Sequence, residues 1–168
     1  MSEAIWGFIG VILGTTATIV ITFLNNKHEV KLLNKEEYNI KKDKFKEFQI
    51  NNFIEMQELI DEFMRCISKI YMYDLMVYKK KGQWGKEGLD ENTSSNEVEL
   101  KRKILIKTQR ISSQFVRSQI EDFIFQYTMY TKETDFERAS KLFKILESQS
   151  VHIIKELGKN LRDLYIKI

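Results

Sequence analysis

The sequence predicts an all-α protein: an N-terminal transmembrane helix, a charged helical stalk and an antiparallel three-helix bundle of coiled-coil-like character. Three observations lead to this fold class. The 168 residues include no proline, which favours long uninterrupted helices. Apolar residues recur in steps of three and four over much of the chain, the period of coiled coils. One N-terminal stretch is uncharged over a length that could cross a bilayer. The expected segments are an anchor over 1–26, a stalk over 27–44 and a cytoplasmic bundle over 45–168.

The composition limits the classes of function. Lys and Arg total 27 against 24 Asp and Glu, and the net charge of +3 is too small to indicate nucleic-acid binding by itself. The single cysteine, Cys66, allows no disulfide within the chain, which suits a reducing compartment. His28 and His152 are the two histidines, so little material exists for metal or triad chemistry. We expect no cofactor, no metal and no nucleic-acid partner.

The anchor is predicted from residues 4–24, which read AIWGFIGVILGTTATIVITFL and carry no charge. A helix of this length spans roughly 31 Å at ~1.5 Å per residue, which matches the hydrocarbon core of a bilayer. A buried core helix is one alternative, but it would need apolar neighbours on every side. A cleaved signal peptide is another, but its start would be basic, and Glu3 is the charged side chain before this stretch.

Lysines flank the predicted span on one side. No Lys or Arg precedes it, whereas Lys27, Lys31 and Lys35 follow it, with three more lysines by residue 44. The positive-inside rule places the C-terminal part in the cytoplasm and the N-terminus outside. The lysines would also attract anionic lipid, although acidic residues between them cancel part of their charge. We therefore expect a single-pass protein of the inner, cytoplasmic membrane, with the lipid bilayer as its first partner.

Small residues line one face of this span. Gly10 and Gly14 form a GxxxG pair, Thr18 continues the stripe, and Gly7 lies one turn earlier. Small side chains let two membrane helices approach closely, and threonines can hydrogen-bond across the contact. The pattern predicts self-association into a homo-oligomer, and the general frequency of glycine in membrane helices is the alternative interpretation.

The opening of the chain resembles that of small uncharacterised bacterial proteins with one N-terminal membrane span. Trp6-Gly7, Ile9-Gly10 and Gly14 carry the resemblance as WGxIGxxxG, which covers about the first 25 residues. The resemblance implies a single-span anchor. It assigns no chemistry, so no functional residue carries over.

Residues 27–44 keep a weaker apolar period. Val30, Leu33 and Ile40 fall on one register, but Glu37 and Lys44 fall on it as well. We interpret the segment as a charged stalk that continues the membrane helix.

Three matched helices are expected from residue 45 onward. The first covers 45–80, the second runs from about Glu97 to Thr131, and the third follows a capping box of Thr134 and Glu137. The second helix would return toward the membrane, so that the turn at 132–134 faces the bilayer. Their apolar stripes are Phe53, Met56, Ile60, Phe63, Ile67, Ile70 and Val77; Ile104, Ile111, Phe115, Ile120, Phe123, Tyr127 and Tyr130; and Phe136, Ala139, Phe143, Leu146, Ser150, Ile153 and Leu157.

A tip loop over 79–96 joins the first two helices. It holds Trp84 between two glycines, close to Lys80, Lys81 and Lys86. An exposed tryptophan in a basic loop would anchor a protein partner. In the alternative arrangement the ring folds back over the end of the bundle.

These features predict a non-enzymatic protein that holds an unknown protein partner at the inner membrane face. We find no Gly-rich phosphate loop and no Glu-x-x-His pair of the kind that di-iron bundles use. The alternative function is a membrane effector, of the toxin or defence type, that oligomerises through its GxxxG span.

Overall fold

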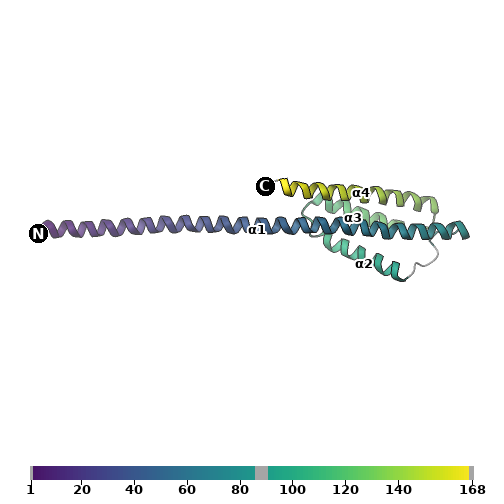
Figure 1. Ribbon diagram of the computed structural model, residues 1–168, viewed down its shortest axis with the longest axis horizontal. Helices are drawn as coiled ribbons and strands as arrows, with labels where there is room; N and C mark the ends of the chain where they lie inside the picture. The colour runs from purple at the N-terminus through teal and green to yellow at the C-terminus, as the bar shows by residue number, and fades with distance from the viewer. Residues whose placement is uncertain (1, 86–90, 167–168) are drawn as a thin grey trace. The chain divides into compact units, whose positions relative to one another are not determined.

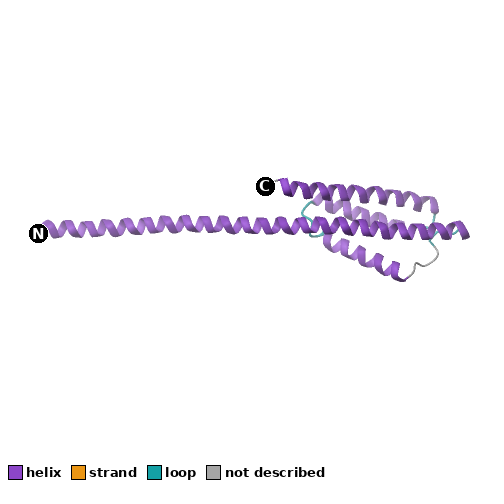
Figure 2. Ribbon diagram, viewed as in Figure 1, coloured by secondary structure: helices purple, strands orange, loops and turns teal. Residues whose placement is uncertain are grey.

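The computed structural model describes residues 2–85 and 91–166; for residues 2–6, 8, 10–13, 17 and 91 it describes the backbone alone. Within these residues the regular structure is helical, as Figure 2 shows. The elements are α1 (Ser2–Lys81), α2 (Glu91–Thr108), α3 (Gln114–Tyr130) and α4 (Phe136–Ile166), labelled in Figure 1. The predicted all-α class is confirmed.

The chain divides into two compact units, Met1–Phe45 and Lys46–Ile168. The first unit is the N-terminal part of α1. The second contains the remainder of α1 together with α2, α3 and α4. The finer division of the first unit into an anchor and a stalk stays a prediction.

The predicted membrane span receives no support from the described part of the chain. Among the described residues, no helix is both long enough and apolar enough to cross a bilayer. The span predicted over 4–24 falls partly on residues whose side chains lie outside that description, Gly10 among them. The anchor stays a prediction.

The second unit is a helical bundle in which α1 lies antiparallel to both α2 and α4. Two contacts fix the direction of α2: Glu55 pairs with Lys107, and Cys66 lies by the Thr93 carbonyl. Two others fix the direction of α4. The Tyr71 hydroxyl lies 3.3 Å from the Ser140 hydroxyl, and an amide N–H of Gln57 donates to the Ile154 carbonyl at 3.0 Å.

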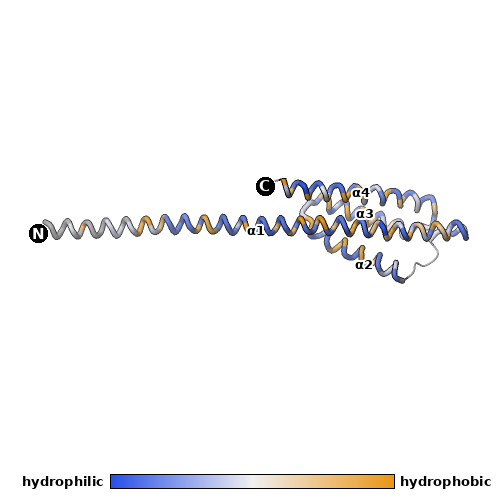
Figure 3. Tube along the Cα trace, in the orientation of Figure 1, coloured by the Kyte–Doolittle hydropathy of each residue, from blue (hydrophilic) through white to orange (hydrophobic). Residues whose placement is uncertain are grey.

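The core lies where the strictest apolar periods predicted it. Every member of the stripe from Phe53 to Val77 is at most 8% exposed. Phe63 is central, because its ring meets Phe123 and Tyr127 of α3 edge-on at centroid distances of 6.0 and 4.8 Å. The fourth helix buries Ala139, Leu146, Ser150, Ile153 and Leu157. Figure 3 shows hydrophobic residues alternating with hydrophilic ones along α4, as one buried face requires.

The predicted single helix from Glu97 to Thr131 is wrong. The chain breaks there into α2 and α3, so the bundle has four helices among the described residues. Ser113 adopts an extended backbone (φ −73°, ψ 111°), and its hydroxyl accepts a hydrogen bond from the Val116 N–H at 3.4 Å. This N-cap starts α3, in which Ile120, Phe123, Tyr127 and Tyr130 of the expected stripe are buried. The exception is Phe115, which is 54% exposed, while the next residue, Val116, is buried in its place.

The turn between α2 and α3 is held by a side chain from α1. Gln49 is 2% exposed. Its amide N–H donates to the Arg110 carbonyl at 2.9 Å, and its carbonyl oxygen accepts from the Ser112 N–H at 3.0 Å. These two bonds satisfy backbone groups that the interruption of the helix would otherwise leave unpaired.

Because of this break, α3 and α4 each run in the direction opposite to the one predicted for their residues. The turn before α4 lies at the Trp84 end of the bundle, where a Cβ on Gly85 would meet the Glu133 carbonyl at 3.4 Å. The prediction placed this turn at the other end of the bundle, facing a bilayer, and that placement is wrong. The start of α4 differs as well: Asp135, not Thr134, caps the helix by accepting from the Arg138 N–H at 2.9 Å.

Candidate functional site

Aromatic rings pack together at the end of the bundle that carries Trp84. The Trp84 side chain is 3% exposed. Its ring centroid lies 5.5 Å from that of Tyr71, 6.3 Å from Tyr78 and 5.3 Å from Phe136. The premise of an exposed tryptophan anchor is therefore wrong. The ring folds back over the end of the bundle, which was the alternative interpretation.

Two glycines direct the ring inward. Gly82 has φ +67° and Gly85 has φ +64°, values that favour glycine because it lacks a Cβ. The Gly82 N–H donates to the Tyr78 carbonyl at 2.7 Å, and α1 ends there in the manner of a left-handed C-cap. The chain then turns sharply on both sides of Trp84.

The structure describes two of the three lysines that were predicted to lie near the ring. Lys80 and Lys81 are exposed in the last turn of α1, where positive charge is favourable to the helix dipole. Lys86 lies outside the described residues. The surface at this end is thus basic, while the aromatic group beneath it belongs to the core.

A carboxylate and a phenol are buried close to the aromatic cluster. Asp74 is 9% exposed and Tyr130 is 3% exposed. The pKa of the Tyr130 phenol is raised mainly by burial and secondly by the nearby charge of Asp74. Its hydroxyl oxygen has no hydrogen-bond partner among the described residues. Burial likewise raises the pKa of the Asp74 carboxyl above its ordinary 3.8, so its ionised form destabilises the fold.

We expect Asp74→Asn to stabilise the bundle at pH 7 by up to about 1 kcal/mol, since the carboxylate keeps partial access to solvent. The folded state binds this proton more tightly than the unfolded state. Stability therefore falls as the pH rises from the ordinary pKa of 3.8 through the raised pKa of the folded state. Chemical denaturation at several pH values should show the difference vanish in acid. Asp122→Asn, on an exposed residue of α3, is the control; a variant less stable than wild type at pH 7 would contradict the prediction.

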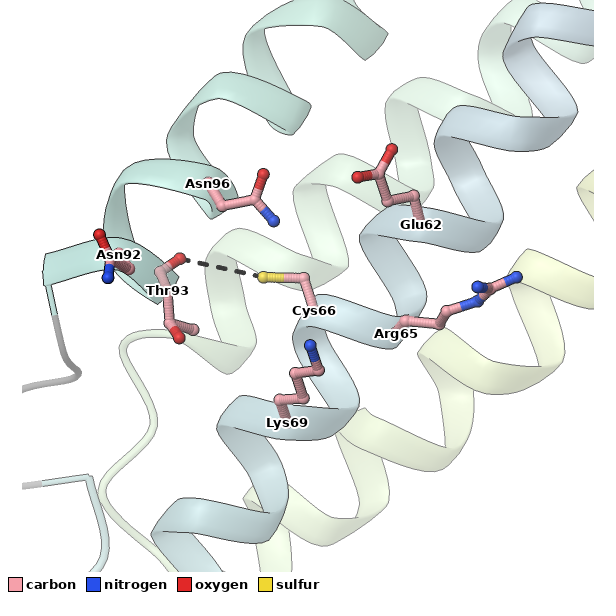
Figure 4. Close-up of a pocket in the computed structure, with 7 residues that line it drawn as sticks. All are labelled: Glu62, Arg65, Cys66, Lys69, Asn92, Thr93 and Asn96. Atoms are coloured by element: carbon pink, nitrogen blue, oxygen red, sulfur yellow. Dashed lines mark hydrogen bonds between the residues drawn. The ribbon is translucent and has the colours of Figure 1, made fainter.

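A second candidate site is a hollow between α1 and the start of α2, shown in Figure 4. Its volume is about 410 Å³. The lining consists of Glu62, Arg65, Cys66, Lys69, Asn92, Thr93 and Asn96. The Cys66 sulfur lies 4.0 Å from the Thr93 carbonyl, and Arg65 pairs with Asp61 of its own helix. The lining thus mixes both charges with neutral polar groups.

The predicted span and stalk residues are exposed wherever they are described. A Cβ added to Gly7 or Gly14 would meet nothing within 4 Å, while the side-chain environment of Gly10 lies outside the described residues. The Thr18 hydroxyl donates to the Gly14 carbonyl at 2.8 Å, which occupies its donor within its own helix. The predicted juxtamembrane lysines are exposed on α1 as well: Lys27, Lys31 and Lys35.

The exposure of several apolar residues was not predicted from the sequence. Met72 and Met76 lie one turn apart on α1 and are 52% and 55% exposed. Phe125 and Met129 repeat this arrangement on α3, with 61% and 46% exposed. All four fall outside the heptad stripes, which is the signal that could have identified them as surface residues.

Neither a cluster of metal-ligating side chains nor a match to a known protein points to a further site. In the described part of the chain, no three His, Cys, Asp or Glu side chains gather as a metal site would require. The chain matches no protein-family model, no curated protein and no solved structure.

Proposed function

We propose that this protein is a single-pass membrane-tethered helical interaction protein, which holds a protein partner at the inner face of the membrane. The observation that carries the proposal is the exposure of the apolar side chains toward the end of the uncharged stretch. Ile19, Val20, Ile21, Phe23 and Leu24 are 51–69% exposed. Side chains of this size on one helix are stabilised by transfer out of water, and lipid supplies an apolar surround on all sides.

Charge supports the orientation of the proposed anchor. The stretch is followed by the exposed lysines 27, 31 and 35, which favour the cytoplasmic side. The bundle would then lie in the cytoplasm.

The exposed apolar pairs support the partner-binding part of the proposal. Methionine adapts to irregular partner surfaces because its side chain is unbranched and polarizable. Met72 and Met76 lie on the same α1 face, near the basic end that carries Lys80. A partner helix with an apolar stripe and acidic flanks would fit this surface.

The anchor is tested by extraction of the full-length protein from cell membranes. We expect it to stay with the membrane pellet after an alkaline carbonate wash. Ile19→Arg should release part of it, because a charge within a span is unfavourable, by up to about 2.5–3.5 kcal/mol at the centre. Leu32→Arg replaces an equally apolar exposed residue of the stalk and should not. Recovery of the wild-type protein in the soluble fraction would refute the anchor.

Partner binding is tested by crosslinking the full-length protein in its own cells, with the products identified by mass spectrometry. One heterologous partner should dominate, and Met72→Glu should remove it. Val151→Glu changes an exposed residue of α4 and should leave the crosslink intact. A partner lost equally in both variants would place the binding surface elsewhere.

The alternative function, a self-associating membrane effector, is favoured by one observation. The helix surface at Gly7 and Gly14 is open, so a second helix could approach its backbone closely. Overexpression of the wild type should then arrest growth, and Gly14→Ile should abolish the arrest. Unimpaired growth on overexpression would count against this function.

A further inference from the structure

The first unit carries a seam of exposed side chains at alternating steps of four and three residues. The stalk seam, as we call it, consists of Ile19, Phe23, Asn26, Val30, Leu33, Glu37 and Ile40. Its five apolar members are 48–69% exposed. Phe23, Val30 and Glu37 take the a positions of a heptad. The d positions are Ile19, Asn26, Leu33 and Ile40. Such a seam over three heptads is the surface through which helices pair in coiled coils.

The charges beside the stalk seam follow the same register. The e positions are Lys27, Asn34 and Lys41, none of them acidic. The g positions are Glu29, Glu36 and Asp43, all of them acidic. The six side chains are exposed. One edge of the seam is therefore negative, and the other edge is neutral or positive.

This charge pattern selects both an occupant and a direction. In a parallel coiled coil, a g residue lies opposite the e residue of the next heptad on the other helix. A second copy of the chain would place Glu36 opposite Lys41 twice, once on each side. An antiparallel pair would instead bring the acidic edges together and the basic edges together, which is repulsive.

We propose that residues 19–43 pair with the same segment of a second copy of this chain, as a parallel two-stranded coiled coil in register. The polar members of the seam fit this arrangement. Asn26 and Glu37 would meet their own counterparts, and an isolated polar core position fixes register at a cost in stability. In the single chain Glu37 pairs with Lys41 at 2.6 Å, so a positive charge already lies beside its carboxylate.

The pairing shares Ile19 and Phe23 with the proposed anchor, and its other seam residues follow the predicted span. It uses neither the bundle surface nor the glycine face. Gly7 and Gly14 take f positions of this register, on the side of the helix away from the stalk seam. The tests of the pairing change only residues 33–42, beyond the predicted span over 4–24, so their outcome is read separately from membrane attachment and partner capture.

Disulfide trapping in the full-length protein tests the geometry. Single variants Leu33→Cys and Ile40→Cys place a thiol at d positions, which face their own counterparts only when two helices are parallel and in register. Mild oxidation should convert most of each variant into a covalent dimer. Lys35→Cys and Lys42→Cys, at outward f positions two residues further on, are the matched controls. The wild-type chain, whose Cys66 is 4% exposed, gives the background.

Charge exchange tests the partner. Glu36→Lys in the Ile40→Cys chain should lower the dimer yield by about tenfold, because two attractive pairs become repulsive. Lys41→Glu should do the same. Co-expression of the two chains should restore a mixed dimer, in which both pairs are attractive again. Trapping at the d positions no higher than at the f positions would overturn the proposal, and so would trapping that ignores these charge changes.

Discussion

Replacing Trp84 with alanine should lower the free energy of unfolding of the bundle by about 4 kcal/mol. The indole is almost fully buried and contacts three aromatic rings from two different helices. Removing it leaves a cavity that the turns at Gly82 and Gly85 cannot collapse without moving the backbone. Chemical denaturation of the full-length protein, followed by circular dichroism, measures the loss.

Two further variants separate packing from surface binding at this end of the bundle. Trp84→Phe should recover part of the lost stability, because a smaller ring still fills most of the space. Lys80→Ala, on an exposed neighbour, should change stability by less than about 0.5 kcal/mol. If Trp84→Ala left stability unchanged but abolished a partner crosslink, the ring would be a surface anchor and the packed arrangement would be wrong.

Phe63→Ala should be as damaging, at about 4 kcal/mol. Phe63 is fully buried, and its ring meets Phe123 and Tyr127 of α3 edge-on. Edge-on aromatic pairs stabilise by more than the buried area alone. We expect a lower denaturation midpoint with an unchanged denaturant dependence, as for a cavity in a bundle that still unfolds cooperatively.

The matched control for Phe63 is a phenylalanine on the bundle surface. Phe125 is 61% exposed, so Phe125→Ala should cost less than about 0.5 kcal/mol. Equal losses in the two variants would show that the core does not centre on Phe63.

The sequence predicted the helices that bury one continuous face. The stripes of α1 and α4 keep strict steps of three and four, because a buried stripe tolerates few polar residues. The stripe through the middle of the chain was less regular, and there the prediction of one long helix was wrong. Ser112 and Ser113 mark the break locally, as serine favours N-caps. The bonds from Gln49 that stabilise the turn come from residues far away in sequence, which a local period cannot show.

The candidate site could be located from sequence but not oriented. The glycines around Trp84 predicted a turn. The direction of the ring depends on the positive φ angles of these glycines and on contact with Phe136, which begins α4 and is distant from Trp84 in the sequence. Asp74 falls on the apolar stripe of α1 between Ile70 and Val77, and its burial shows that the stripe continues past it. The exposure of Met72 and Met76 was not predicted, although their positions outside the heptad stripe indicated it.

The pairing of α1 with α4 has a consequence for how the protein is made. A ribosome releases α1 well before α4, and Tyr71 of α1 stacks on Phe143 of α4 at a centroid distance of 4.1 Å. Until the 31 residues of α4 emerge, one side of the buried α1 stripe has no covering helix. During synthesis this stripe is a binding surface for chaperones and for other nascent chains. Messages truncated before residue 136 would leave it permanently uncovered.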